Sequence, residues 1–325
     1  MDSSSPALRW GLVGLGRHVT EEIAPAMQRS LAAQIIACAG RDISAAGAFA
    51  ERFAVPKAHD TFEDLVHDPD VDAVFVATPN AFHTAVVLAA ARAGKHILCE
   101  KPLALTVADG RAMVAACREA GVRLRVGLHL RFERSLQRVA EVLRSGVIGT
   151  PRAIAMERTA PLGERVPWRV DPAQGGSILF DVGVHLLDIV PRLLATEIAA
   201  ISALAMPGPQ TGHSADTITM LLRLRDGVQA TLRVSREAPF AGNDLVVIGT
   251  AGMLRTGPLR WVTEHRITVT TATGTSEETV PATDLYRAEI DEFAADVADS
   301  DRRLATGEDG LGLIVLTEAV ERALR

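Results

Sequence analysis

The stretch His-Ile-Leu-Cys-Glu-Lys-Pro-Leu-Ala-Leu-Thr, residues 96–106, decides the fold. An apolar run stops abruptly at Glu100-Lys101-Pro102, and a helical pattern opens after Thr106. The residue before a proline is restricted to extended geometry, so we expect Lys101 at the tip of a strand. Ligands bind at the carboxyl edge of an open parallel sheet, which makes Lys101 a candidate catalytic residue. A solvated lysine at the end of a strand is the alternative.

A glycine turn follows the first predicted strand, residues 8–13. Gly14-Leu15-Gly16 stands between this strand and an amphipathic stretch that runs to about Ser30, the context that a dinucleotide-binding motif needs. Gly14 permits the tight turn, and Gly16 lets the backbone approach a pyrophosphate at the helix N-terminus. Val19 occupies the third glycine position, so the motif is incomplete. A plain glycine-rich turn is the alternative.

The second predicted strand, residues 34–39, ends at Gly40-Arg41-Asp42, and Ser44 is the predicted N-cap of the next helix. NAD-binding units usually carry Asp or Glu here, about 20 residues after the glycines, to hold the ribose hydroxyls. A guanidinium instead binds a 2′-phosphate in bidentate fashion, so Arg41 favours NADP. Asp42 stands one residue too late, which keeps NAD as the less favoured alternative. A solvated loop charge is the alternative for Arg41.

Alternating strands and helices define the first half of the chain. Further strands are predicted at 71–77, 96–99 and 123–128, with helical patterns between them, which indicates βαβ units and a parallel sheet. From Asp216 the pattern predicts antiparallel strands, with Asp226-Gly227 as a hairpin turn. We therefore expect an α/β protein with an N-terminal Rossmann domain (1–129). A C-terminal α+β domain (130–325) with a large open, mostly antiparallel sheet would follow.

Polar residues in two other segments are candidates for a site. Thr78-Pro79-Asn80 ends the third strand, and His83 either contacts the cofactor or is a satisfied histidine at a helix start. Asp181, His185 and Asp188 have the spacing i, i+4 and i+7, so we expect them on one helix face. Such a polar stripe is costly to bury unless it lines a site. The alternative is an Asp–His pair satisfied inside a domain interface.

Composition narrows the function classes. The 325 residues are 48% hydrophobic and 23% charged, as in soluble globular proteins, and the net charge of −6 argues against a nucleic-acid or membrane partner. No secretory signal precedes the first strand. Cys38, Cys99 and Cys117 lie in apolar segments without metal-like spacing, which predicts buried thiols, no metal site and a cytoplasmic location. Apolar positions on the open sheet would suit a homodimer or homotetramer.

Together these motifs resemble the Gfo/Idh/MocA family of oxidoreductases over nearly the whole chain. The resemblance joins Gly14-x-Gly16 to Thr78-Pro79-Asn80 with His83, then to Glu100-Lys101-Pro102 and to Asp181-x-Gly183-x-His185. It implies a Rossmann domain, a second domain with a large open sheet, and NAD(P)-dependent oxidation or reduction of sugars, cyclitols and related alcohols. Gly40-Arg41 is similar to the NADP-preferring branch that includes dihydrodiol and xylose dehydrogenases.

The resemblance also implies roles for individual residues. Lys101 matches the catalytic lysine of the family, and Asp181 and His185 match its acid and its histidine on the substrate side. His185 is our first choice for the general base because imidazole titrates near neutral pH, with Asp181 orienting it. Lys101 would then hydrogen-bond the reacting oxygen, and the converse assignment, with Lys101 as the base, stays open. The cofactor-binding residues expected are Gly14, Gly16, Arg17, His18, Arg41, Thr78, Pro79, Asn80, His83, Glu100 and Lys101. The substrate-binding residues expected are His129, where we expect a family asparagine, and Arg131, Trp168, Arg169, Asp181 and His185, with Arg165 as a further candidate.

Two other functions use the same fold. A non-catalytic dinucleotide-binding sensor or scaffold would have no need of Lys101, Asp181 and His185 together. A redox-assisted glycosidase would recycle tightly bound NAD, which Gly40-Arg41 makes less favoured. Small-molecule substrates are expected for the oxidoreductase, and the sequence does not identify them.

Overall fold

The computed structural model describes residues 6–161, 167–169, 171–207, 215–258, 262–298 and 303–324. The chain divides into two compact units, Met1–His129 with Asp284–Ile314, and Leu130–Thr283 with Val315–Arg325. The break after His129 coincides with the predicted boundary, whereas residues 284–314, predicted in the second domain, group with the first unit. One reason is that β16 (Ala305–Thr306) pairs with β6 (Leu124–Gly127). Another is that Arg125 Nη2 donates to Asp296 Oδ1 at 2.8 Å.

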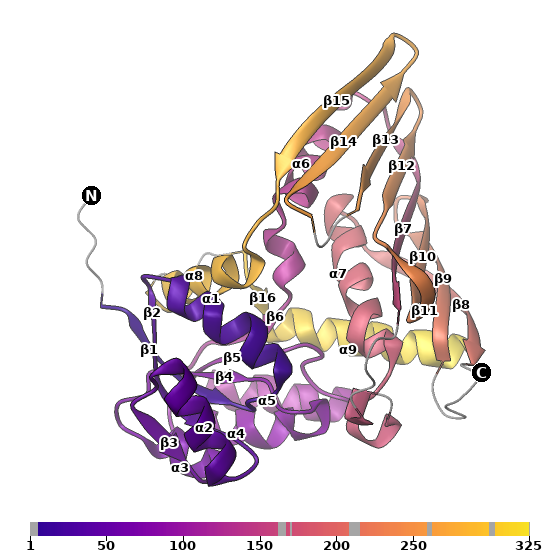
Figure 1. The fold of residues 1–325 in the computed structure, drawn as a ribbon. Helices are drawn as coiled ribbons and strands as arrows, with labels where there is room; N and C mark the ends of the chain where they lie inside the picture. Colours follow the sequence, from indigo (N-terminus) through magenta and orange to yellow (C-terminus); the bar gives the residue numbers. More distant parts are fainter. Residues whose placement is uncertain are drawn as a thin grey trace. The chain divides into compact units, whose positions relative to one another are not determined.

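A seven-stranded sheet forms the core of the first unit (Figure 1). Its order is β16-β6-β5-β4-β1-β2-β3, and all pairs are parallel except β16 with β6. The other strands are β1 (Leu8–Val13), β2 (Ala33–Ala39), β3 (Lys57–His59), β4 (Ala73–Val76) and β5 (His96–Glu100). The order reverses between β1 and β4, and ligands of open α/β sheets bind at such a switch point, beside the carboxyl ends of the strands. The predicted parallel sheet is confirmed.

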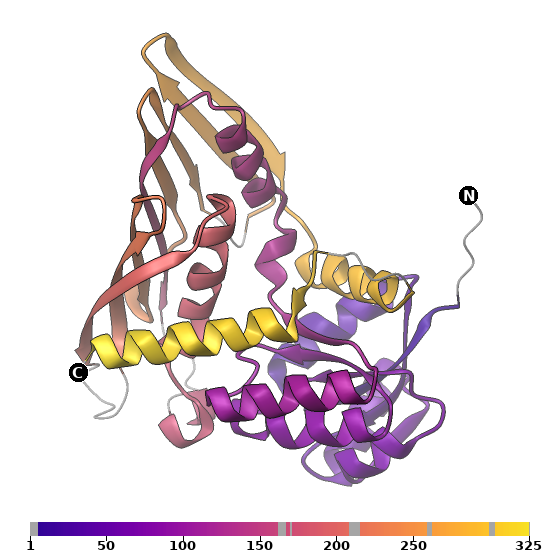
Figure 2. The ribbon, with the colours of Figure 1, turned by 180° about the vertical axis from the view of Figure 1, so that it is seen from behind.

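Helices cover both faces of this sheet. On one face α1 (Ala24–Arg29) packs with α8 (Leu285–Ala298), and on the other α3, α4 and α5 lie side by side (Figures 1 and 2). The bounds of the remaining helices here are α2 (Ile43–Phe53), α3 (Phe62–His67), α4 (His83–Arg92) and α5 (Val107–Glu119), while α9 (Gly307–Ala323) begins in this unit. Single-turn helices are η1 (Val19–Ile23), η2 (Asn80–Phe82) and η3 (His129–Phe132).

The N-cap of α2 differs from the prediction. Asp42, not Ser44, caps this helix, and its carboxylate accepts a hydrogen bond from the Ala45 backbone N at 2.8 Å. Both residue types are good caps, and the extended backbone at Asp42 is what selects it. In the same way Thr61 caps α3, where its hydroxyl accepts a hydrogen bond from the Asp64 backbone N at 3.1 Å.

A nine-stranded, mostly antiparallel sheet forms the second unit, as predicted. The order is β15-β14-β13-β12-β7-β10-β9-β8, with β11 also on β7, and β7 with β10 is the parallel pair. The strands are β7 (Pro151–Pro161), β8 (Ile198–Pro207), β9 (Ala215–Leu224), β10 (Gln229–Ser235), β11 (Glu237–Gly242), β12 (Leu245–Gly249), β13 (Gly252–Gly257), β14 (Glu264–Thr271) and β15 (Gly274–Pro281). The predicted Asp226-Gly227 turn joins β9 to β10, with Gly227 at φ +87°.

Two helices of the second unit, α6 (Arg134–Arg144) and α7 (Val184–Leu193), lie against one face of its sheet (Figure 1). Before α7 come the short turns η4 (Pro167–Arg169), η5 (Pro172–Gln174) and η6 (Leu179–Gly183). Among the described residues, the stretch Pro172–Leu193 is long and apolar enough to cross a membrane, with mean hydropathy 1.2. Because 72% of its apolar window is buried inside the protein, it is a core helix.

The three cysteines are buried free thiols, which confirms that prediction. Burial raises the pKa of Cys38 to about 11 and the pKa of Cys117 to about 12. It raises the pKa of Cys99 well above its ordinary value. All three thiols therefore stay protonated and unreactive near neutral pH.

Candidate functional site

The glycine turn after β1 has the geometry that a dinucleotide site needs. Gly14 has φ +93°, and a Cβ there would lie 2.6 Å from the Ala77 carbonyl and from the Thr78 N, so only glycine fits. A Cβ on Gly16 would meet no protein atom within 4 Å, so the turn backbone can be approached closely from that side. Val19 opens η1, a π-type turn of a kind often found at functional sites. These features fit the pyrophosphate of a dinucleotide.

The residues expected around the dinucleotide follow successive strand ends of the same sheet. Arg41 is exposed after β2, and Arg17 is exposed beside Glu21, with 3.7 Å between Arg17 Nε and Glu21 Oε2. Thr78 and Pro79, after β4, are partly buried, and Asn80 is buried. The first unit therefore brings this predicted set to one edge of its sheet.

His83 differs from the others in this set because its side chain is fully buried. Its Nδ1 lies 2.9 Å from the Pro102 carbonyl, and its Nε2 lies 3.1 Å from the Thr78 carbonyl. Burial lowers the pKa of His83, which those two carbonyls act to raise. Both nitrogens thus face backbone carbonyls, which agrees with the alternative of a satisfied histidine at a helix start: His83 links the end of β4 to the end of β5.

Glu100 lies buried beneath Lys101 and is linked to the glycine turn. Its Oε1 lies 3.0 Å from His18 Nε2, and its Oε2 accepts from the Lys101 backbone N at 3.2 Å. Burial acts to raise the pKa of the Glu100 carboxyl, but the charges of His18, Lys101 and His83, with the His18 hydrogen bond, hold it below its usual value. The Glu100 carboxyl is therefore ionised at the end of β5, next to Lys101.

Tyr286 is a residue of this cluster that the sequence did not indicate. It opens α8, far along the chain, yet its ring centroid lies 5.2 Å from that of His18 and 4.8 Å from that of His129. His129 and Tyr286 are both buried. His129, predicted to bind substrate, therefore packs against the tyrosine at the end of β6. The one available signal was composition, since Tyr286 is the single tyrosine of the chain.

The second unit contains Asp181 and His185, the acid and the histidine predicted on the substrate side. Asp181 lies in η6, a π-type turn, and Arg169 Nη1 donates to both of its carboxylate oxygens, at 2.8 and 2.9 Å. The Trp168 ring stacks on Arg169, with the guanidinium carbon 5.1 Å from the ring centroid. His185 lies in α7 and is buried. Arg165 lies outside the described residues.

Arg131, predicted to bind substrate, is instead buried against Asp188. Its Nε donates to Asp188 Oδ2 at 2.9 Å, and its Nη2 donates to Oδ1. The two aspartates of the predicted polar stripe therefore pair with different arginines: Asp181 pairs with Arg169, and Asp188 pairs with Arg131. The Arg131–Asp188 pair therefore links η3 to α7, and Asp188 lies three residues after His185 in this helix.

Within the first unit, a glycine turn fit for pyrophosphate and a lysine at a nearby strand end are features of a dinucleotide-dependent enzyme. Two family models match the chain. The oxidoreductase family with an NAD-binding Rossmann fold matches residues 8–128, and the GFO/IDH/MocA C-terminal domain matches residues 136–255. The chain belongs to the GFO/IDH/MocA family, and it is an NAD(P)-dependent oxidoreductase that acts on alcohol or ketone groups.

Individual relatives and solved structures are similar to the chain over most of its length. The chain is 32% identical to 1,5-anhydro-D-fructose reductase of Ensifer adhaerens over 97% of its own length and 96% of that protein. It is 32% identical to mouse trans-1,2-dihydrobenzene-1,2-diol dehydrogenase over 76% of its length and 74% of that protein. Among solved structures, aldose-aldose oxidoreductase from Caulobacter crescentus, complexed with glycerol, superposes with a TM-score of 0.89 at 27% identity, covering 98% of this chain and 97% of that one. A 3-ketoreductase from Actinomadura kijaniata, in complex with NADP and TDP-benzene, gives 0.90 at 26% identity, covering 98% of each chain.

Proposed function

We propose that the chain transfers a hydride between NADP(H) and a carbinol or carbonyl carbon of a sugar, cyclitol or related alcohol. The observation that carries the proposal lies in the first unit, where Lys101 follows β5 in the sheet whose β1 ends in the glycine turn. The names of the relatives, a sugar reductase and a diol dehydrogenase, support this substrate class.

The chemistry divides between the cofactor and the protein. When bound, the nicotinamide supplies the hydride or accepts it. The glycine turn would hold the pyrophosphate, and Lys101 would hydrogen-bond the reacting oxygen. His185 would take or return the proton as general base or acid, and Asp181 would stabilise the charged imidazole. The converse proposal, with Lys101 as the base, is distinguished by the arginine variant described in the Discussion.

Consumption of NADPH tests the activity against a sensor function. We expect NADPH to be oxidised in the presence of at least one ketose or cyclic ketone, or NADP to be reduced by a polyol. A non-catalytic sensor would bind NADPH, but the NADPH absorbance would stay constant with every substrate tested. If the chain binds the dinucleotide but turns over no compound of a broad panel, the proposed activity is wrong and the chain is a sensor.

The preference for NADP rests on Arg41. Asp42, the carboxylate next to Arg41 in the chain, caps α2, while Arg41 is exposed after the end of β2. We expect Arg41→Ala to raise the KM for NADPH about 10- to 100-fold, the loss of charge-assisted hydrogen bonds worth about 1.5–3 kcal/mol. The KM for NADH should change little.

Arg52→Ala is the matched control for this change. Arg52 is an exposed arginine in the last turn of α2, so its replacement removes the same charge from the helix that follows Arg41. We expect steady-state kinetics with NADPH to be unchanged in this variant. Equal losses with NADPH and NADH in Arg41→Ala would contradict the preference.

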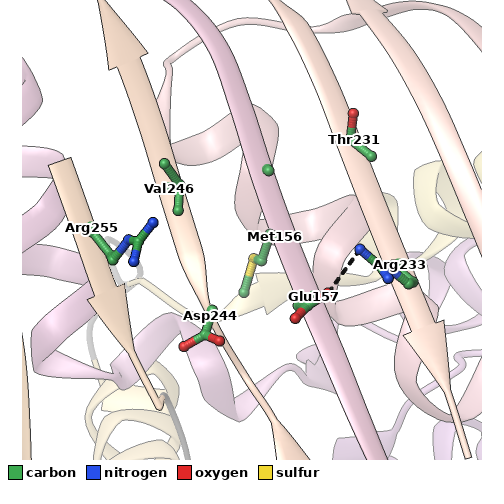
Figure 3. A pocket seen from close by; sticks show the side chains of 8 residues that line it. Met156, Glu157, Thr231, Arg233, Asp244, Val246 and Arg255 are labelled. Atoms are coloured by element: carbon green, nitrogen blue, oxygen red, sulfur yellow. Dashed lines mark ion pairs between the residues drawn. The ribbon is translucent and has the colours of Figure 1, made fainter. Parts of the chain in front are cut away.

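We further propose that a second copy of the chain covers the outer face of the nine-stranded sheet. Exposed Leu221 in β9 stands in one row with Thr231, Ala155 and Val246 of the next three strands. A hollow of about 290 Å³ on this face is lined by Ala155, Met156, Glu157, Thr231, Arg233, Asp244, Val246 and Arg255 (Figure 3). Charges of both signs around exposed apolar groups suit a self-complementary interface.

Size-exclusion chromatography with light scattering tests this interface. We expect the wild type to be a dimer or tetramer, and Leu221→Glu to shift it towards monomer, because the new carboxylate would be buried without a partner. Leu31→Glu is the control, since Leu31 is exposed in the first unit and is not part of this sheet. A monomeric wild type would contradict the proposal.

We also propose a cytoplasmic location. The buried free thiols support it, because reduced cysteines are typical of reducing compartments. Fractionation of the cells that produce the protein would test it.

A further inference from the structure

His18 links the glycine turn to the strand that precedes Lys101. It follows this turn after β1, and its Nε2 lies 3.0 Å from Oε1 of Glu100, the last residue of β5. β4 lies between β1 and β5 in the sheet, and neighbouring strands are about 4.8 Å apart. The His18–Glu100 pair therefore reaches across β4, from the turn expected to bind pyrophosphate to the strand end expected to carry the reaction.

The Glu100 carboxylate is held from several sides. The Glu100 side chain is 9% exposed, and a Cβ on Gly127, which stands opposite it on β6, would lie 3.4 Å from the carboxylate. Oε2 accepts a hydrogen bond from the Lys101 backbone N at 3.2 Å, while Oε1 faces His18. Because the carboxylate is buried, a lost hydrogen-bond donor is not readily replaced by water, and the orientation of the group depends on the donors that the protein supplies.

The imidazole of His18 is itself held in position. The Tyr286 ring lies edge-on to it, with 5.2 Å between the ring centroids and 72° between the ring planes. Tyr286 is buried, and the side chain of His18 is 29% exposed. This contact limits rotation of the imidazole, so Nε2 stays directed at Glu100.

We infer that His18 is a positioning residue for the reaction, because it fixes the carboxylate that holds the Lys101 backbone. One carboxylate group makes both contacts, so a change at Oε1 reaches the Lys101 N through Oε2. The backbone at Lys101 directs its side chain, and a small misplacement of a reacting group is costly in rate. The inference rests on the proposed role of Lys101 and adds a residue that supports it.

Kinetics of His18→Leu test the inference. Leucine is close in size to the imidazole but cannot donate a hydrogen bond, so we expect kcat to fall about 10- to 100-fold, the range of hydrogen bonds to charged groups. The Kd for NADPH should stay within a few-fold of the wild-type value. His18→Gln, whose amide can donate to Glu100 in place of Nε2, should restore kcat to near the wild-type value. His67→Leu is the control, because His67 is exposed at the end of α3 and its replacement should leave kcat unchanged.

Hydrogen exchange at the Lys101 amide provides a second arm that does not need turnover. The Lys101 N–H donates to Glu100 Oε2, and Pro102 next to it has no amide proton, so mass spectrometry of peptides spanning residues 98–106 can follow this site. We expect exchange at Lys101 to be at least about tenfold faster in His18→Leu than in the wild type or in His18→Gln. His18→Ala, which needs no room beside Tyr286, is measured alongside with the same expectation.

The possible results separate this inference from the proposed function. A raised Kd for NADPH with an unchanged kcat would mean that His18 only contacts the cofactor, and it would overturn the inference. Unchanged exchange at Lys101, or a His18→Gln variant as slow as His18→Leu, would overturn it as well. Absence of turnover in the wild type would instead count against the proposed function, and hydrogen exchange would still decide whether His18 positions the Lys101 backbone.

Discussion

Replacing Lys101 with alanine is expected to lower kcat by about 10³-fold or more, the range in which general acid–base and electrostatic groups act. The dissociation constant for NADPH should change by no more than a few-fold, because in the proposed mode the glycine turn and Arg41 would bind the parts of the dinucleotide far from the nicotinamide. Stopped-flow turnover and fluorescence titration with NADPH measure the two quantities separately. Turnover close to that of the wild type would remove Lys101 from the proposed mechanism.

Two further variants help to interpret the result of Lys101→Ala. Lys57→Ala is the matched control, because Lys57 pairs with Asp68 and Asp70 at the opposite edge of the sheet and should leave kcat unchanged. Lys101→Arg keeps the positive charge but cannot release a proton near neutral pH. Recovery of activity in the arginine variant would assign Lys101 an electrostatic role, with His185 as the base. Continued inactivity would favour a proton-transfer role for the amine.

The parallel core was predictable because each strand carries its own signal. β4 and β5 are buried along nearly their whole length, and such strands are continuous apolar runs in the sequence. Edge strands lack this signal. β3 has three residues, none of them fully buried, and all but one of the eight residues of β15 are exposed. Both strands form because a neighbouring strand pairs with their backbone groups.

Candidate site residues could be named from the sequence only where a recognisable strand ends. Gly14, Gly16, Arg41 and Lys101 could be named because each follows a recognisable strand. Partners that come from distant segments could not be, since nothing local indicates that Tyr286 packs on His18 and His129.

Residue type likewise did not reveal which candidate side chains are already paired. His83 and Arg131 have the chemistry of ligand-binding residues, yet the fold surrounds both with protein acceptors. Burial, which depends on the whole unit, decided their roles.

Breaking the Arg131–Asp188 pair is expected to cost more stability than any exposed ion pair of the chain. In Arg131→Met the Asp188 carboxylate is left buried without its counter-charge, a loss of about 3–5 kcal/mol. At about 2–4 °C per kcal/mol for a unit of this size, the thermal midpoint of the second unit should fall by about 10 °C. Differential scanning calorimetry measures this midpoint. Arg225→Met is the control, because Arg225 and Glu197 are both 69% exposed and such pairs contribute about 0–1 kcal/mol.

The double variant Arg131→Met with Asp188→Leu separates the charge from the packing. If the cost of the single change is an unpaired buried charge, removing both charges should restore much of the lost stability, so that the two substitutions are strongly non-additive. Additive losses would mean that Arg131 acts through its packing, and an unchanged midpoint in Arg131→Met would show that the pair contributes nothing. Because Asp188 follows His185 by less than one turn of α7, the same variants should also lower kcat while leaving NADPH binding unchanged, as expected if Arg131 positions the helix that carries the histidine.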